Sequence, residues 1–152
     1  MGNVDASDAG SDFWGGHDFC WACRVLQGTS PGVIVTEGDI AVLINPMPLT
    51  PGHVLVVPRS HVENIYELPD ALPGPILSMA ARVARVSKHV LAADGVTLRQ
   101  NNGAASGQHL FHFHLHVIPR FFGDDERFGA QPQVMSIAEQ EVIIGRTRAS
   151  LG

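Results

Sequence analysis

The sequence is poor in charged residues, which make up 16% of its 152 residues, against about 25% in an average globular domain. Disorder is excluded, because disordered chains are poor in aliphatic side chains and this one is 45% hydrophobic. The formal net charge of −5 argues against binding nucleic acids or anionic membranes through bulk positive charge. The length predicts one ordinary domain, residues 17–152, preceded by a flexible tail, residues 1–16.

A long hydrophobic run is also missing. No stretch approaches the roughly 18 apolar residues that a membrane-spanning helix needs. A secretory leader begins with basic residues before its apolar stretch, but no lysine or arginine precedes Arg24. We therefore expect a cytoplasmic protein that binds neither membranes nor nucleic acids.

Cysteine is scarce, and the only two cysteines, Cys20 and Cys23, are separated by two residues. This spacing is too short for a typical structural disulfide, which a reducing cytosol also disfavours. The residues alone leave three interpretations open: a redox pair, two buried structural cysteines, or one half of a zinc site completed by histidines.

Turn residues and hydrophobic periodicity predict an α+β domain with a mainly antiparallel sheet of about five strands and one main helix. Apolar residues recur every three or four positions over residues 76–90, which indicates the helix, and Gly95 is expected to stop it. A short C-terminal helix is expected at residues 136–144. The expected strands are residues 32–36, 40–44, 53–57, 96–100 and 110–118, the last ended by Pro119.

The most informative pattern is a stripe of three histidines, His112, His114 and His116, at alternate positions of the last strand. Alternate side chains of a strand share one face, so these three imidazoles are expected to point the same way. Packing alone does not select three histidines on one face. The residues expected on the opposite, core-facing side are Phe111, Phe113, Leu115 and Val117.

Two chemistries use such a stripe: a catalytic metal held by several histidines, or nucleophilic attack by the central imidazole. The preceding loop helps to decide, because Gly107 lets a phosphate approach the backbone and Gln108 offers an amide donor. No carboxylate lies between Asp94 and Asp124 to serve as base or as partner of a metal-bound histidine. The loop therefore favours phosphate chemistry without a catalytic metal.

These residues carry a resemblance. Residues 112–118 (HFHLHVI) resemble the H-φ-H-φ-H-φ-φ signature of the histidine triad (HIT) family of nucleotide hydrolases and transferases, where φ is hydrophobic. Residues 51–61 (PGHVLVVPRSH) are similar to the family's P-G/T-H-φ-φ-φ-φ-P-K/R-x-H segment. The loop from Asn101 to Gly103 and the closing pair Pro119-Arg120 also match, so the resemblance covers about residues 18–123.

The resemblance implies an enzyme that hydrolyses nucleoside phosphoramidates or dinucleoside polyphosphates, with a purine nucleotide as the expected substrate. The middle histidine, His114, would attack the α-phosphorus and form a nucleotidyl-imidazole that water then cleaves. His116 and Gln108 would donate hydrogen bonds to the phosphoryl oxygens. The residues implied in nucleotide binding are Asn45 at the ribose, Asn101 and Gly107 at the phosphate, His53 as a support for the triad, and residues 40–44 as walls for the base.

The resemblance also implies a structural zinc ion, with no catalytic metal required. Bacterial members with an N-terminal CxxC suggest Cys20, Cys23, His61 and His112 as the zinc ligands. A homodimer is expected as well. Relatives often carry serine or threonine where this chain has His109, so its leaving-group preference stays open. Two other functions also remain open: a zinc-dependent hydrolase with the histidine stripe as catalytic metal site, and a nucleotide-binding regulatory module with little turnover.

Overall fold

The computed structural model describes residues 20–28, 32–124 and 137–151, so the predicted tail, residues 1–16, lies outside the described residues. Within them, five strands form one antiparallel sheet in the order β1-β2-β3-β5-β4. The strands are β1 (Val33–Glu37), β2 (Ile40–Ile44), β3 (Val54–Pro58), β4 (Gly95–Arg99) and β5 (Leu115–Arg120). The helices are α2 (Trp21–Leu26), η1 (Ile65–Glu67), α3 (Pro73–Val90), η2 (Ala104–Ser106) and α4 (Ile137–Leu151). The expected α+β class is confirmed.

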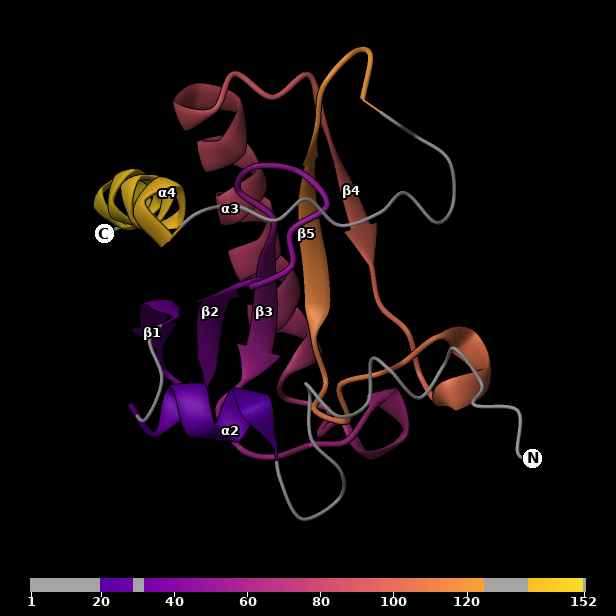
Figure 1. Cartoon of the computed structure of the whole chain (residues 1–152). Coiled ribbons are helices and arrows are strands. Elements are labelled where there is room, and N and C mark those ends of the chain that lie inside the picture. Colours follow the sequence, from indigo (N-terminus) through magenta and orange to yellow (C-terminus); the bar gives the residue numbers. More distant parts are fainter. Residues whose placement is uncertain (1–19, 29–31, 125–136, 152) are drawn as a thin grey trace, which may run out of the picture.

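The long helix α3 packs against one face of the sheet, behind β3 and β5 in Figure 1. Its buried apolar side chains are Ile76, Met79, Ala80 and Val83. They share a core with alternate residues of three strands: Val42, Val54, Val56 and Val117. Each fully buried aliphatic side chain stabilises the fold by about 1.5–3 kcal/mol. A slip of one residue would turn these side chains to the other face of the sheet, so their burial fixes the register of the strands.

The short helix α2 packs at one end of the opposite face, at the bottom of Figure 1. Its buried residues Ala22 and Val25 contact Leu43, Leu55 and Val57. Because alternate residues of a strand point to opposite faces, all residues of β2 and residues 54–57 of β3 are buried in one layer or the other. This second layer leaves the same face of β5 and β4 available for polar side chains.

The predicted strand 110–118 is partly wrong, since β5 begins only at Leu115 and continues through Pro119 to Arg120. Before Leu115 the chain bonds to a neighbouring loop, with the Phe113 N–H donating to the Val62 carbonyl. Pro119 is tolerated because β3 has no residue paired with it, so its missing N–H costs no bond to β3. Phe113, Leu115 and Val117 join the core as expected, whereas Phe111 is half-buried and outside both buried clusters.

The predicted helix stop is also wrong. Helix α3 ends at Val90, and the left-handed residue after it is Ala92, with φ 54°. The N–H groups of Leu91 and Ala93 both donate to the Ser87 carbonyl, which holds this turn without a glycine. Gly95 instead opens β4.

Helices α2 and α4 differ from the sequence expectation, and the short helices η1 and η2 lie where no helix was expected. Helix α2 was not predicted, and it places the two cysteines together, because Cys20 is its N-cap and accepts a hydrogen bond from the Cys23 N–H at 3.3 Å. The C-terminal helix is longer than residues 136–144. Its Arg148 donates to the carbonyls of Ile34 and Val33, which ties α4 to β1. Among the described helices, none combines the length and apolar character needed to cross a membrane.

Candidate functional site

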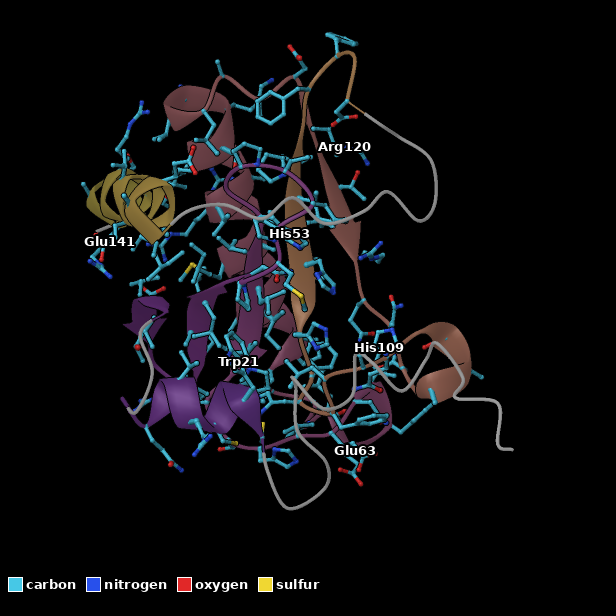
Figure 2. The ribbon with its side chains drawn as sticks, in the orientation of Figure 1. Trp21, His53, Glu63, His109, Arg120 and Glu141 are labelled. Atoms are coloured by element: carbon cyan, nitrogen blue, oxygen red, sulfur yellow. The ribbon has the colours of Figure 1, made fainter. Side chains whose placement is uncertain are left out.

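A small pocket of about 110 Å³ lies on the sheet face opposite α3. It collects residues from β3, β4, β5 and the loop that carries η2, and Figure 2 shows His109 beside that loop. Most of its lining side chains are polar. The lining residues are Asn45, Leu55, Arg99, Asn101, Gly107, His109, Leu110, His114 and His116.

Strand register explains the floor of the pocket. Leu55 of β3 is paired with His116 of β5, which is paired in turn with Arg99 of β4. Directly paired residues point to the same face with their Cβ atoms about 4.5–5.5 Å apart. The floor is therefore apolar at the β3 end, and it carries a full positive charge at the β4 end.

His114 is the residue just before β5, and its side chain lines the pocket. Its Nδ1 lies 2.7 Å from the carbonyl oxygen of His112, so Nδ1 carries the proton and donates it to that oxygen. The second ring nitrogen, Nε2, is then left with its lone pair. A neutral imidazole held in this tautomer is competent to act as a nucleophile.

His116 is held by a second buried histidine, His53. The Leu49 N–H donates to Nδ1 of His53 at 3.0 Å, which places the His53 proton on Nε2. That nitrogen lies 2.9 Å from Nδ1 of His116 and donates to it. His116 therefore keeps its own proton on Nε2, where it can donate a hydrogen bond. Its ring lies edge-on to that of His114, with 4.8 Å between centroids.

The environment keeps these imidazoles neutral. Burial is the main cause, because it disfavours a charged ring, and the guanidinium of Arg99 adds repulsion. The pKa of His53 falls to about 3 and that of His116 to about 2. Burial also lowers the pKa of His114, against the opposing effect of its bond to His112.

The loop before β5 is shaped by Gly107 and Asn101. Gly107 has φ +89°, and a Cβ there would lie 3.1 Å from Nδ2 of Asn101, so only glycine fits without strain. The Asn101 amide donates to the Ser106 carbonyl at 2.7 Å. Asn45 lies at the end of β2, where its Oδ1 accepts the Met47 N–H. The structure thus brings Asn45, Asn101 and Gly107 to the pocket that His114 and His116 line.

Gln108 differs from expectation. It is buried and absent from the pocket lining. Its Nε2 donates to the carbonyls of Glu63 and Leu110, and its Oε1 accepts the Gly103 N–H. Both amide hydrogens therefore already have backbone partners, so donation to a phosphoryl oxygen would require breaking one of these bonds. In this structure Gln108 braces the loop.

Residues 40–44 also differ from expectation, because all five are buried in the two hydrophobic layers and none lines the pocket. Its apolar lining comes from Leu55 and Leu110 instead. Sequence reasoning missed Arg99. The signal for it was weak: Arg99 alternates with Val96 and Leu98 in a short strand, but its pairing with His116 depends on a long-range register.

The three histidines do not serve one site, since His112 belongs to a separate cluster with Cys20, Cys23 and His61. The potential ligand atoms of these four residues all lie within 4.8 Å of one another. Nδ1 of His112 is 3.3 Å from the Cys20 sulfur and 3.6 Å from the Cys23 sulfur. Nδ1 of His61 is 3.5 Å from the Cys23 sulfur.

These distances fit a tetrahedral metal ion. Zinc bonds of about 2.0–2.3 Å place tetrahedral ligands about 3.3–3.8 Å apart, and two cysteines with two histidines form a common structural zinc set. Nε2 of His112 donates to the Pro58 carbonyl at 2.8 Å, which leaves Nδ1 free to face the sulfurs. Without a metal, burial and the neighbouring Cys20 raise the pKa of Cys23 to about 12. The distances and the free Nδ1 of His112 make the cluster able to hold a metal. The other interpretations of the CxxC lose support.

Comparison with known proteins agrees with this geometry. The family model described as "HIT domain" matches residues 28–123. "Protein hit" of Bacillus subtilis is 34% identical over 112 residues, which cover 73% of this chain and 77% of that protein. "Adenylylsulfatase HINT3" of Arabidopsis thaliana is 33% identical over 123 residues, 78% of this chain and 57% of the plant protein.

A solved structure is also similar. The Zn-bound histidine triad family protein from Mycobacterium smegmatis superposes with a TM-score of 0.76 at 30% identity, covering 90% of this chain and 95% of that one. Sequence match, sheet order and the paired histidines of the pocket all agree with the family that residues 112–118 resemble. The chain belongs to the HIT family.

Proposed function

We propose that this protein is a nucleotide hydrolase that cleaves its substrate at the α-phosphorus, with His114 as the covalent nucleophile. The observation that carries this proposal is the 2.7 Å bond from Nδ1 of His114 to the His112 carbonyl, which directs the ring's lone pair to Nε2. Neutral imidazole is a good nucleophile near pH 7 and a good leaving group afterwards. Lowered pKa values keep His114 and His116 in that neutral form.

The reaction proceeds in two displacements. Nε2 of His114 attacks the α-phosphorus, a phosphorus–nitrogen bond forms, and the bond from phosphorus to the leaving group breaks. Water then attacks the same phosphorus, a phosphorus–oxygen bond forms, the phosphorus–nitrogen bond to His114 breaks, and the nucleoside monophosphate is released. Over the whole cycle one proton of the water is gained by the leaving group, the other stays with the nucleoside monophosphate or passes to solvent, and His114 returns to its starting form. Nε2–H of His116 donates to a phosphoryl oxygen, where negative charge accumulates.

The substrate class that we propose is a purine nucleotide carrying a phosphoramidate, polyphosphate or sulfate leaving group. Phosphoramidates and dinucleoside polyphosphates follow from the family resemblance, and the name of the plant relative adds adenylyl sulfate. Asn45 would contact the ribose, while Asn101 and Gly107 would lie beside the phosphate. His109 lines the pocket where relatives often carry a hydroxyl, so it would contact the leaving group.

We also propose that Cys20, Cys23, His61 and His112 hold a structural zinc ion. Bound there, zinc would supply no chemistry to the substrate, only a crosslink between α2 and the chain entering β5. Four protein ligands close a tetrahedral site and leave no open position for water or substrate. Of the three histidines of the stripe, His112 belongs to this cluster, so only His114 and His116 line the pocket, whereas catalytic zinc sites use three protein ligands. The geometry therefore disfavours the alternative of a catalytic metal on the histidine stripe.

A homodimer is proposed from the sheet edges. Strand β1 is covered by α4, whereas no strand in the described part of the chain pairs with the outer side of β4. Leu98 of this edge strand is 45% exposed. Open edges readily pair with a second chain. Light scattering after size-exclusion chromatography should give twice the chain mass, and a species of 16.3 kDa would overturn the dimer.

Turnover of a substrate panel tests the enzymatic proposal. Adenosine phosphoramidate, diadenosine polyphosphates and adenylyl sulfate are incubated with wild type, His114→Ala and the control His89→Ala, each with and without a chelator. His89 is an exposed histidine of α3, on the far side of the sheet. Wild type and the control should release AMP, and His114→Ala should not. If all three proteins bind the nucleotide and none of them turns over a substrate, the regulatory module is favoured.

A further inference from the structure

Among the described residues that line the pocket, Arg99 is the one lysine or arginine. It is paired with His116 across β4 and β5, so the two side chains lie next to each other on the same face of the sheet. A guanidinium stays charged at every physiological pH. No carboxylate is among the lining residues, and no described carboxylate forms an ion pair with Arg99.

The Nε atom of Arg99 is buried and has no hydrogen-bond partner among the described residues. A buried donor on a charged group is costly when it is left unpaired. The neighbouring histidines do not accept from it: the Nδ1 atoms of His114 and His116 have other partners, and no hydrogen bond joins Nε of Arg99 to either Nε2 in the described structure. The Arg99 side chain is therefore placed to donate a hydrogen bond to an anion that enters the pocket.

The polarity of the pocket gives that anion an orientation. Leu55 and Asn45 line the β3 end, and Arg99 lines the β4 end, with His116 between. A ligand with an apolar or neutral part at one end and a phosphate at the other matches this gradient. The planar fork of arginine is well suited to phosphate oxygens.

We propose that Arg99 binds a phosphoryl oxygen of the nucleotide held beside His114 and supplies a full positive charge toward that phosphate. This assignment rests on the proposed function for the identity of the ligand. Within it, His114 forms the bond to phosphorus and His116 donates a neutral hydrogen bond. The charge of Arg99 makes the pocket bind nucleotides, which carry a phosphate, more tightly than nucleosides, which do not.

Calorimetric binding of AMP and of adenosine tests this assignment, using wild type, Arg99→Gln, Arg99→Lys and the control Arg85→Gln. Arg85 is exposed on α3, on the opposite side of the sheet. In Arg99→Gln, AMP binding should weaken by about tenfold or more, the range expected for loss of a charge-assisted hydrogen bond. Adenosine binding should stay unchanged in this variant. Arg99→Lys should keep part of the AMP affinity, and the control should bind as wild type does.

Unchanged AMP affinity in Arg99→Gln would overturn the assignment. Equal weakening of AMP and adenosine would also overturn it, because a general distortion of the pocket affects both ligands. Thermal unfolding of each variant verifies that it folds, and Arg99→Lys serves as a second test if Arg99→Gln does not. The outcome is separable from the proposed function: wild type that binds AMP without turning over any substrate would contradict the hydrolase but not Arg99.

Discussion

The backbone carbonyl of His112 accepts a hydrogen bond from Nδ1 of His114 at 2.7 Å, while the ring of His112 faces the sulfurs of Cys20 and Cys23. One residue thus belongs to the metal cluster through its side chain and orients the proposed nucleophile through its backbone. This connection explains how a structural metal would influence catalysis without touching the substrate. It also makes the effects of metal removal and of nucleophile removal separable.

Metal removal should lower stability before it lowers activity. A chelator should reduce the melting temperature of wild type by several degrees, because the crosslink between α2 and the chain entering β5 is lost. The initial rate, measured directly after chelator addition, should stay unchanged. Elemental analysis should find one zinc per chain in wild type and none in Cys23→Ser, whose melting temperature should not respond to chelator. An immediate loss of rate at an unchanged melting temperature would contradict the structural role.

Stability should fall as the pH is lowered through the range where histidine ordinarily titrates. Unfolded His53 has a pKa of about 6.5, whereas folding lowers it to about 3. Below about pH 6.5 the unfolded chain therefore binds more protons, which favours unfolding. His53 alone should lower the free energy of unfolding by about 2 kcal/mol between about pH 7 and about pH 5.

Urea denaturation of wild type and His53→Asn across that range measures this contribution. The variant should be less stable at neutral pH, because the bond to His116 is lost. Its stability should also depend less on pH, since the shifted imidazole is gone. Identical slopes in the two proteins would show that His53 does not cause the acid sensitivity.

Gly107→Ala should impair both stability and turnover. The residue has φ +89°, and an added Cβ would lie 3.1 Å from the Asn101 amide, inside the pocket. Strain of this kind costs about 1–3 kcal/mol. Gly38→Ala is the matched control, because Gly38 also has positive φ but no described atom within 4 Å of an added Cβ. The control should lose stability and keep its turnover, and equal activity losses in both variants would refute a specific role of the loop.

Sequence reasoning located most of the fold, because hydrophobic periodicity and turn residues are local signals. The hairpin of β1 and β2, strand β3 and helix α3 all lie within a few residues of their predicted ranges. The errors arose where tertiary bonds decide the local structure. Within residues 110–114, Phe113 bonds to the loop residue Val62 rather than to a strand, and Ala92 takes the left-handed turn that a glycine was expected to provide.

The candidate site also contains residues that local motifs predicted and residues whose place depends on distant parts of the chain. The metal cluster and the pair His114 and His116 follow from short motifs, so a resemblance was enough to propose them. Arg99 enters the pocket only because β4 pairs with β5 in one particular register. Gln108 was assigned to the phosphate from its motif position, but its amide also donates to the carbonyl of Glu63, which lies far away in the sequence. Such long-range partners leave no local pattern in the sequence.

Trapping the covalent intermediate tests the central claim most directly. Wild type is mixed with a substrate in excess, quenched with a denaturant at a pH that preserves phosphorus–nitrogen bonds, and digested for mass spectrometry. A nucleotidyl group should be found on the peptide that contains His114, on that residue alone, and it should disappear when substrate is exhausted. His114→Ala should lose turnover by at least about a thousandfold and carry no label. Full turnover in His114→Ala, or a label on another residue that forms and decays at the turnover rate, would contradict the account.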